Sequence, residues 1–423
     1  MQHILQQTTD HDMNSAAPLP SGKKVLIYYY MFGNTLGGSD YLPLLFIEEL
    51  QRRGCSVILA LDWKSDIEHA INHYGIELDV HAVDIVLVKP ESNVLRRLDA
   101  ILPFYRTRQL KKLAKDADIC ISTANMIDFG KPAHHVVYLM RLFGDNAFCD
   151  FFMHRKPLSG LSLFKRKLRT FLAETILRPL LGMRSTRTII ADRREHIYVP
   201  SQYVANTMRT FYGDFNCTVF YPPTMFDIPS MEIERVPLRV IYLGRVQKEK
   251  GITEIIGIVE LARSVSGQDI QLHIAGPLTP GEYADTIKRT VSEKPWVRLI
   301  DPVYGDDKAA FLLGGTYAVH ARRDEEFGIS VAEYLKAGII PIVPDEGGSM
   351  EVVGNPELTY RTDEEAARIL ARLLVDETFR QKQAGLCKKR AEAFSFEHYL
   401  ETQHRILDRI LDSLPSTGQQ SGE

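Results

Sequence analysis

The chain has 423 residues, of which 45% are hydrophobic and 25% are charged, and its formal net charge is −3. This length exceeds what one hydrophobic core usually organises, so we expect two domains of roughly 150 to 200 residues. The balanced charge excludes a globally basic nucleic-acid-binding protein. No apolar run approaches the ~20 residues that a membrane-spanning helix needs, which excludes an integral membrane protein.

The two ends of the chain are polar, and we expect a disordered lead over residues 1–21 and a disordered tail over residues 415–423. The lead has no apolar core of the kind found in signal peptides. The cysteines are scattered, without the paired spacing of a zinc site, which predicts free thiols in a reducing cytoplasm. They are Cys55, Cys120, Cys149, Cys217 and Cys387.

The first half alternates apolar strands with helical patterns. Its first segment, "KKVLIYYY" at 23–30, has the continuous apolar character of a strand buried on both faces. A glycine-bearing loop and a helical pattern ending at Gly54 follow, and then come "CSVILALD", "DIVLVKP", "DICISTA" and "HHVVYLM", with a long helical pattern over 96–117. This alternation predicts a doubly wound α/β domain over residues 22–222.

A second alternation follows a proline-rich linker at 223–236. Its strands are predicted at "LRVIYLG", "QLHIAG", "VRLID", "YAVHA", "IIPIVP" and the short "LTYR". The sequence therefore predicts a second Rossmann-like domain over 237–394 and a last helix over about 395–414 that returns to the first domain.

Ligands of open α/β sheets bind beyond the carboxyl ends of the strands, and two loops there carry unusual residues. After the first strand, "MFGNTLGGSDY" supplies Gly33, Gly37 and Gly38, whose backbone N–H groups could approach an anion; a tight turn without a ligand is the alternative. After the first strand of the second domain, Arg245 and Lys250 are two cations that would neutralise a diphosphate. Solvated surface charge is the alternative for this pair.

Two glutamates, Glu325 and Glu333, stand eight positions apart in "RRDEEFGISVAEYLKAG". The first lies in a loop and the second in a helix expected to start near Ile329 and to end at Gly338. Helical and extended rises place the carboxylates on the order of 10 Å apart, which suits two hydroxyl-bearing rings of one extended ligand. The helix N-terminus between them, with Gly328 allowing close approach, would face the negative charge that joins those rings.

These motifs resemble the retaining glycosyltransferases of family 4, which have the GT-B fold. The resemblance rests on "GR…KEKG", "EEFGISVAEYLKAG" and "EGGSMEVVG" and covers nearly the whole chain. It implies an α/β protein whose two Rossmann-like domains face each other across a cleft that binds a nucleotide-diphosphate sugar.

The resemblance also implies a role for each motif residue. Glu325 would bind hydroxyls of the transferred sugar and Glu333 those of the ribose, while Arg245 and Lys250 would hold the diphosphate. The remaining donor-binding residues would be Gly37 and Gly38 in the first domain, Gly328, Ile329 and Ser330 at the helix start, and Val303, between Asp301 and Tyr304, beside the base.

The mechanism implied is attack of the acceptor on the face from which the phosphate departs, with that phosphate as base and without a metal or a further cofactor. The cations and the helix dipole would stabilise the departing charge. One departure concerns a histidine that many members carry after the strand read as "HHVVYLM", where this chain has Met140 and Arg141. His320 is a candidate neighbour of the sugar, and a structural histidine is the alternative.

The glutamate region looks most like mannosyltransferases that build lipid-linked oligosaccharides, which favours GDP-mannose weakly over rhamnose, glucose and N-acetylglucosamine donors. The implied acceptor is a glycan or a lipid-linked glycan of cell-surface polysaccharide or lipopolysaccharide synthesis. An epimerase or a phosphorylase fits these motifs poorly. A catalytically inactive sugar-nucleotide-binding scaffold of the same fold is the alternative.

Residues 155–194 hold eleven basic and two acidic side chains, a local net charge of +9. Their apolar residues recur at helical spacing, as in a helix that lies in a membrane interface. We expect this segment to dock a cytoplasmic protein on an anionic inner membrane surface. An ordinary helix of the first domain is the alternative. The apolar residues are Phe164, Leu168, Phe171, Leu172 and Ile176.

Overall fold

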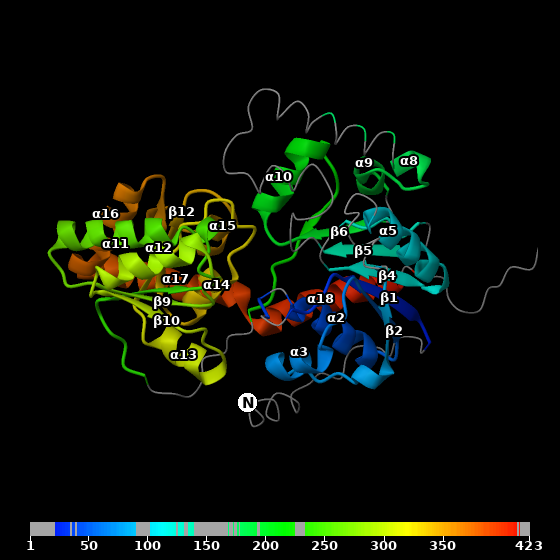
Figure 1. Ribbon diagram of the computed structural model, residues 1–423, viewed down its shortest axis with the longest axis horizontal. Helices are drawn as coiled ribbons and strands as arrows, with labels where there is room; N and C mark the ends of the chain where they lie inside the picture. Colours follow the sequence, from blue (N-terminus) through cyan, green and yellow to red (C-terminus); the bar gives the residue numbers. More distant parts are fainter. Residues whose placement is uncertain are drawn as a thin grey trace, which may run out of the picture. The chain divides into compact units, whose positions relative to one another are not determined.

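A computed structural model gives the fold of the chain (Figure 1). It describes residues 22–33, 36–38, 40–89, 102–123, 126–130, 134–138, 178–192, 195–224 and 233–412, with the single positions 168, 172, 176 and 414. The predicted lead, the tail and most of the linker lie outside these residues. The chain divides into two compact units, one of residues 1–200, 205–220 and 402–423, the other of 201–204 and 221–401.

The first unit contains a parallel sheet of seven strands in the order β3-β2-β1-β4-β5-β6-β7. β1 pairs with β2 on one side and with β4 on the other, so the winding of the sheet reverses at β1. The strands are β1 (Lys24–Tyr29), β2 (Ser56–Leu61), β3 (Val83–Leu87), β4 (Ile119–Ser122), β5 (His134–Tyr138), β6 (Glu195–Val199) and β7 (Thr218–Val219).

The central strands of this sheet are apolar because helices cover them. Val25 to Tyr29 of β1 are all buried, as the continuous apolar run predicted. The helices are α2 (Tyr41–Arg52), α3 (Ile67–Tyr74), α5 (Leu102–Leu113), α8 (Arg178–Leu180), α9 (Thr186–Ile190) and α10 (Gln202–Tyr212). The last part of α18 (Phe396–Asp412) also belongs to this unit, where Asp408 pairs with Arg53 of the turn after α2.

The second unit contains six parallel strands in the order β10-β9-β8-β11-β12-β13. As in the first sheet, the winding reverses beside the first strand, here between β8 and β11. The strands are β8 (Arg239–Leu243), β9 (Gln271–Ala275), β10 (Val297–Ile300), β11 (Tyr317–Val319), β12 (Ile340–Pro344) and β13 (Thr359–Tyr360).

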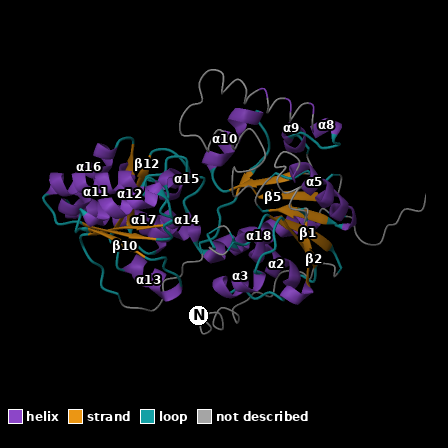
Figure 2. Cartoon of the chain, in the orientation of Figure 1, coloured by secondary structure: helices purple, strands orange, loops and turns teal. Residues whose placement is uncertain are grey.

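Helices flank this second sheet, and Figure 2 shows each group of strands with its surrounding helices. α11 and α16 pack side by side (Figure 1). The helices are α11 (Ile252–Ser266), α12 (Glu282–Ser292), α13 (Gly305–Leu313), α14 (Ile329–Lys336), α15 (Gly348–Val353), α16 (Asp363–Val375) and α17 (Glu377–Ala391). The prediction of two Rossmann-like α/β domains is confirmed.

Sequence reasoning missed two strands of the first sheet. β6 begins with Glu195 and His196 after a charged run, so only three apolar residues signal it. β7 has two residues, too few for any periodic pattern. Both lie at one end of the sheet, so the doubly wound prediction was right and its width was underestimated.

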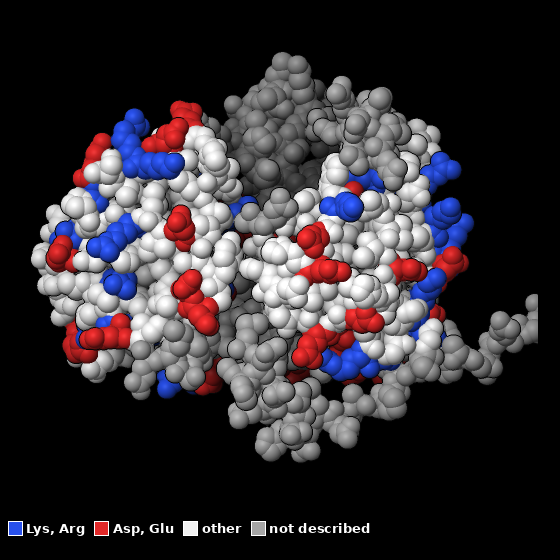
Figure 3. Space-filling view, turned by 60° about the horizontal axis from the view of Figure 1, so that its bottom comes forward, with Lys and Arg blue, Asp and Glu red and all other residues white. Residues whose placement is uncertain are grey.

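Two surface properties of the described residues complete the fold. No helix among them is both long and apolar enough to cross a membrane. Figure 3 shows basic and acidic side chains interspersed over the described part of the face in view.

Candidate active site

The loops after β8 and β11 meet beside the point where the winding of the second sheet reverses. Because β8 and β11 are hydrogen-bonded neighbours, the residues that follow their carboxyl ends share one edge of the sheet. Ligands of doubly wound sheets bind at such a place. The loop after β8 carries Arg245 and Lys250, and the loop after β11 carries Glu325.

A glycine fixes the position of Lys250. A short 3-10 turn, Lys248–Lys250, ends at Gly251, whose φ of 68° is left-handed. A Cβ atom there would lie 2.9 Å from Cβ of Ala321, just after β11, so only glycine allows this approach. The turn therefore carries the Lys250 side chain to the β11 loop.

Glu325 is buried at the centre of a group of charges. Its Oε2 lies 2.6 Å from Nζ of Lys250, and its Oε1 lies 3.5 Å from Nη1 of Arg322. Burial alone would raise the pKa of Glu325, but the charges of Lys250 and Arg322 outweigh it and hold this pKa well below its usual range. The carboxylate is therefore ionised and can accept hydrogen bonds.

The guanidinium of Arg322 contacts the carboxyl groups of three consecutive acidic residues. Besides Glu325, Arg322 contacts Asp324 through Nε at 3.0 Å and Glu326 through Nη2 at 3.3 Å. Burial and the adjacent charge of Glu325 raise the pKa of Glu326, against the opposing effect of Arg322. Oε1 of Glu326 is buried and accepts no hydrogen bond from a described residue. Of the two adjacent glutamates, Glu326 thus takes up a proton before Glu325 as pH falls.

His320 lies beside Glu325, and its predicted place next to the sugar stays a prediction. Its Nε2 is 3.4 Å from Oε2 of Glu325, and neither ring nitrogen makes a hydrogen bond with a described residue. Burial lowers the pKa of His320, and the nearby carboxylate does not reverse this. The ring is therefore neutral at pH 7, and it keeps an unused donor and acceptor in the interior.

The glycine turn at Gly347 and Gly348 contacts the backbone of the acidic loop that carries Glu325. The N–H of Gly348 donates to the carbonyl oxygen of Glu325 at 2.7 Å. A Cβ atom on Gly347 would collide with the carbonyl of Arg323, and one on Gly348 with that of Glu326. The "EGGS" sequence therefore permits backbone contact along the whole acidic loop.

Glu333 is held on α14 by a lysine from another helix. The helix starts at Ile329 after Gly328, whose φ is 95°, and ends before Gly338, in agreement with the predicted bounds. Glu333 is buried, and its Oε1 lies 2.5 Å from Nζ of Lys308 on α13. α14 is fixed to the sheet by Tyr334, whose hydroxyl accepts a hydrogen bond of 2.6 Å from the N–H of Leu243 in β8.

The other predicted residues of this domain lie at the same edge of its sheet. Arg245 is exposed, and its guanidinium has no partner among the described residues. Ile329 and Ser330 form the first turn of α14, and Val303 lies half-buried in the loop after β10. Their roles toward a ligand remain predictions.

The glycine loop of the first domain differs from its prediction in one respect. The N–H of Gly37 donates to Oδ2 of Asp40 at 2.6 Å, so it is already used within the loop. Its carbonyl accepts hydrogen bonds from the N–H of Asp40 and the hydroxyl of Tyr74. Gly38 is exposed next to it. Met140 and Arg141 lie outside the described residues.

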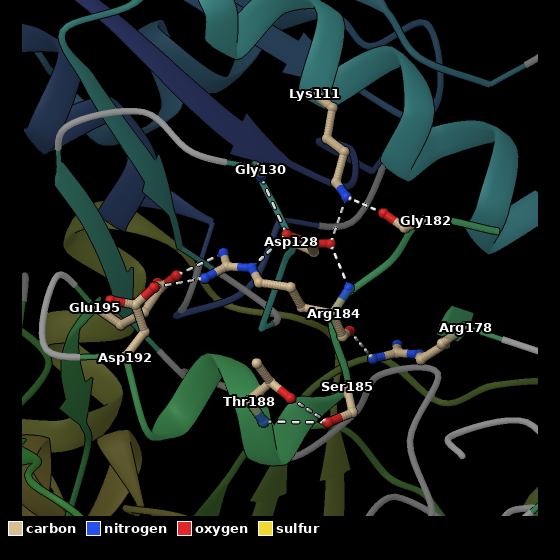
Figure 4. A network of polar contacts seen from close by, with 10 residues as sticks. All are labelled: Lys111, Asp128, Gly130, Arg178, Gly182, Arg184, Ser185, Thr188, Asp192 and Glu195. Carbon is tan, nitrogen blue, oxygen red and sulfur yellow. Dashed lines mark hydrogen bonds and ion pairs between the residues drawn. The ribbon is translucent and has the colours of Figure 1, made fainter. Parts of the chain in front are cut away.

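Part of the basic segment 155–194 is engaged in a buried network (Figure 4). Arg184 contacts Asp128 through Nε at 2.8 Å, Asp192 through Nη1 at 2.9 Å and Glu195 through Nη2 at 2.8 Å. Nζ of Lys111 also lies 2.7 Å from Oδ2 of Asp128. The charge of Arg184 is therefore compensated inside the protein, and it does not contribute to the basic surface that we predicted for this segment.

Three of the apolar residues predicted for a membrane-facing stripe are described, and they are exposed. The exposed fractions are 45% for Leu168, 43% for Leu172 and 47% for Ile176. Phe164, Phe171 and the basic residues between 155 and 177 lie outside the described residues.

Sequence reasoning missed three charged residues of the site. Arg322 and Glu326 flank the motif glutamate, and the run "RRDEE" was a signal that several charges gather there. Lys308 has no motif around it and sits in an ordinary helix, so only the folded chain brings it to Glu333. Among the described residues, no group of three His, Cys, Asp or Glu is placed to hold a metal ion.

One known family model matches part of the second half of the chain. Residues 228–391 match the family model described as "Glycosyl transferases group 1". This range contains Arg245, Lys250, Lys308, Glu325 and Glu333. No curated protein sequence matches the chain.

Solved structures resemble the chain over nearly its whole length. Anabaena HepE, in complex with UDP and glucose, has a TM-score of 0.62 and 14% identity, covering 92% of this chain and 100% of its own. WaaG, a glycosyltransferase of lipopolysaccharide biosynthesis, has a TM-score of 0.62 and 14% identity, covering 93% and 100%. The pneumococcal O-GlcNAc transferase GtfA, in complex with UDP and GlcNAc, has a TM-score of 0.59 and 10% identity, covering 92% and 99%. The GT-B fold prediction is confirmed, whereas no mannose-specific protein is among these three.

Proposed function

We propose that this group 1 glycosyltransferase moves a hexose, with retention of configuration, from a nucleotide-diphosphate sugar to a glycan or lipid-linked glycan acceptor. The observation that carries the proposal is the contact of 2.6 Å between Lys250 and Glu325 beside the winding reversal of the second sheet. It joins a cation suited to a diphosphate and an ionised carboxylate suited to sugar hydroxyls. Both groups lie within the region matched by the family model.

The chemistry follows from the charges of these residues. The bond between the anomeric carbon and the diphosphate oxygen breaks, a bond from the acceptor hydroxyl oxygen to that carbon forms, and the hydroxyl proton passes to the departing phosphate. Lys250, Arg245 and the N-terminus of α14 stabilise the negative charge that develops on the diphosphate. Glu325 accepts hydrogen bonds from the sugar and thereby fixes the anomeric carbon.

The motif resemblance and the similar structures favour different sugar donors. The glutamate motif resembles mannosyltransferases and favours GDP-mannose, whereas the similar structures named above hold UDP with glucose or GlcNAc. We keep GDP-mannose as the first candidate, with UDP-glucose and UDP-GlcNAc as the alternatives that an assay must include. An acceptor in lipopolysaccharide synthesis is in keeping with WaaG, which this chain resembles in fold alone.

A panel of radiolabelled nucleotide sugars tests the activity and names the donor. The purified chain is incubated with each donor, and both release of free sugar and transfer to lipid-linked or lipopolysaccharide acceptors are scored. We expect turnover of one donor, and loss of that turnover in Glu325→Gln. Absence of hydrolysis and of transfer with every donor would instead favour the inactive scaffold.

We also propose that the basic segment 155–194 attaches the first domain to an anionic membrane surface on the cytoplasmic side. The support is the exposure of Leu168, Leu172 and Ile176, which are spaced one helical turn apart. Cosedimentation with anionic liposomes at low and high salt tests the idea, with a Lys165, Arg166, Lys167 and Arg169 neutralised variant as control. The proposal would be overturned if liposome binding changed neither with salt concentration nor on neutralisation of these four charges.

A further inference from the structure

Lys308 makes a contact that the proposed chemistry does not yet use. Its Nζ lies 2.5 Å from Oε1 of Glu333, and the two side chains are 26% and 7% exposed. Among the described residues, no other cation is paired with Glu333. The contact joins two helices through residues that are 25 positions apart in the sequence.

The position of Lys308 connects two parts of the donor region. The N–H of Lys308 bonds to the carbonyl oxygen of Tyr304 at 3.2 Å, in the loop after β10 where Val303 lies. The side chain of Lys308 then reaches α14, which begins at the loop after β11. One residue thus links the loop assigned to the base with the glutamate assigned to the ribose.

The chemistry of a carboxylate shows what this link provides. A carboxylate has two oxygens and about four acceptor sites, so an ammonium on Oε1 leaves Oε2 and further lone pairs for other donors. A buried carboxylate without a partner is strongly disfavoured, and its side chain would turn toward solvent or take up a proton. Either change would remove the acceptor that two ribose hydroxyls require.

We propose that Lys308 is a positioning residue for ribose recognition. It fixes the Glu333 carboxylate on α14 so that the free oxygen meets the ribose hydroxyls, and it thereby gives the site its preference for ribonucleotides. This inference rests on the proposed function, in which Glu333 binds the ribose. The ammonium does not contact the reacting atoms, so we expect Lys308 to act on donor binding and to leave the chemical step largely intact.

Calorimetry with nucleoside diphosphates tests the proposal without knowledge of the acceptor. The probes are UDP and GDP and their 2′,3′-dideoxy forms, and the measured quantity is the ratio of Kd between each dideoxy probe and its parent. In the wild type we expect this ratio to be about tenfold to hundredfold, since hydrogen bonds to a charged group are lost. In Lys308→Met we expect the ratio to fall to about threefold or less, with recovery in Lys308→Arg.

Two controls separate a specific role from a structural one. Lys288→Met removes an exposed lysine of α12 and should leave the ratio unchanged. Glu333→Gln should lower the ratio by itself, and Lys308→Met should add nothing in that background. If Lys308→Met keeps the wild-type ratio of Kd values, the inference is overturned. In that case, a lowered ratio in Glu333→Gln still upholds the ribose role of Glu333. A wild type that binds neither UDP nor GDP overturns the proposed function itself.

Discussion

Arg184 in the first domain and Arg322 in the second each contact three carboxyl groups, and the two arrangements differ in the lengths of these contacts. In the first domain, Arg184 meets its three partners at 2.8 to 2.9 Å. In the second, Arg322 meets its partners at 3.0, 3.3 and 3.5 Å. Beside Arg322, both nitrogens of His320 and one oxygen of Glu326 have no hydrogen bond to a described residue.

We expect the cluster around Arg184 to act on stability and the cluster around Arg322 to act on the activity proposed above. Short contacts in a buried network hold segments together, and here Arg184 ties the loop before α9 to β6 and to Asp128. Buried polar groups without partners are uncommon in proteins and call for an explanation. The function proposed above offers an explanation for His320 and Glu326, since a bound donor would supply the missing partners.

The largest effect should come from removing the arginine of the first domain. Arg184→Met removes the cation that Asp128, Asp192 and Glu195 share and leaves Lys111 beside Asp128 alone, so we expect the free energy of unfolding to fall by about 3 to 5 kcal/mol. Thermal and urea unfolding measure this loss. Arg187→Met, which changes an exposed arginine of α9, should shift stability by less than about 1 kcal/mol. A fully stable Arg184→Met protein would show that this network has no structural role.

Removing the carboxylate of the second cluster should affect activity more than folding. We expect Glu325→Gln to lower kcat/KM by about a hundredfold or more, near 3 kcal/mol, because its hydrogen bonds strengthen in the transition state. Steady-state kinetics with the identified donor measures the loss, and circular dichroism checks the fold. Glu346→Gln, an exposed neighbour in the glycine turn, is the control. Unchanged kinetics in folded Glu325→Gln would remove this residue from the site.

Lys250 should matter for the nucleotide even when no sugar is transferred. We expect Lys250→Ala to weaken nucleoside-diphosphate binding by at least ~1.5 kcal/mol, the value of a hydrogen bond to a charged group. Lys248→Ala, an exposed lysine two positions earlier, should bind as the wild type does. Equal affinity of both variants by calorimetry would assign Lys250 to the ion pair with Glu325 alone.

The smallest effect concerns pH and has opposite signs in the two clusters. The folded protein raises the pKa of Glu326, so its ionised form lowers stability at pH 7 and this loss disappears as pH falls through the raised pKa. Glu326→Gln should therefore stabilise the protein at pH 7 by up to about 1 kcal/mol, and the gain should shrink toward pH 4.

Asp128 supplies the matched comparison. Burial would raise its pKa, but Lys111 and Arg184 lower it. Its contribution to stability is present above the unfolded pKa of ~3.9 and is lost as pH falls through the lower folded pKa. Asp128→Asn should thus destabilise the protein at pH 7. Urea unfolding at pH 7 and pH 5 compares the two variants, and equal signs would contradict the distinction between the clusters.

The fold followed from local sequence patterns because parallel buried strands are continuous apolar runs. The β8 strand was predicted at 238–244 and lies at Arg239–Leu243, and the last helix was predicted from Phe396 and begins there. The same reasoning failed for β6, whose polar first residues are stabilised by a distant partner: Glu195 pairs with Arg184. Tertiary contacts of this kind leave no periodic signal.

Residues of the candidate site could be predicted from the sequence only where a motif lies directly after a strand or before a helix. Glu325, Lys250 and Gly328 follow directly from their positions after strands or before a helix. Lys308 could not be assigned in this way, since an ion pair between α13 and α14 depends on how the helices pack. The use of the Gly37 N–H by Asp40 was also invisible, because a turn that binds an anion and a turn that binds its own carboxylate share one composition.

The contact between the glycine turn and the acidic loop limits which substitutions of the two glycines the protein can tolerate. Every glycine codon becomes an alanine codon through one base change, yet a methyl group at Gly347 or Gly348 would collide with the backbone that carries Glu325. Such alleles arise readily, and they would displace the carboxylate without altering any charged residue. Screens for loss of the proposed activity should therefore recover substitutions in a segment to which no catalytic side chain is assigned.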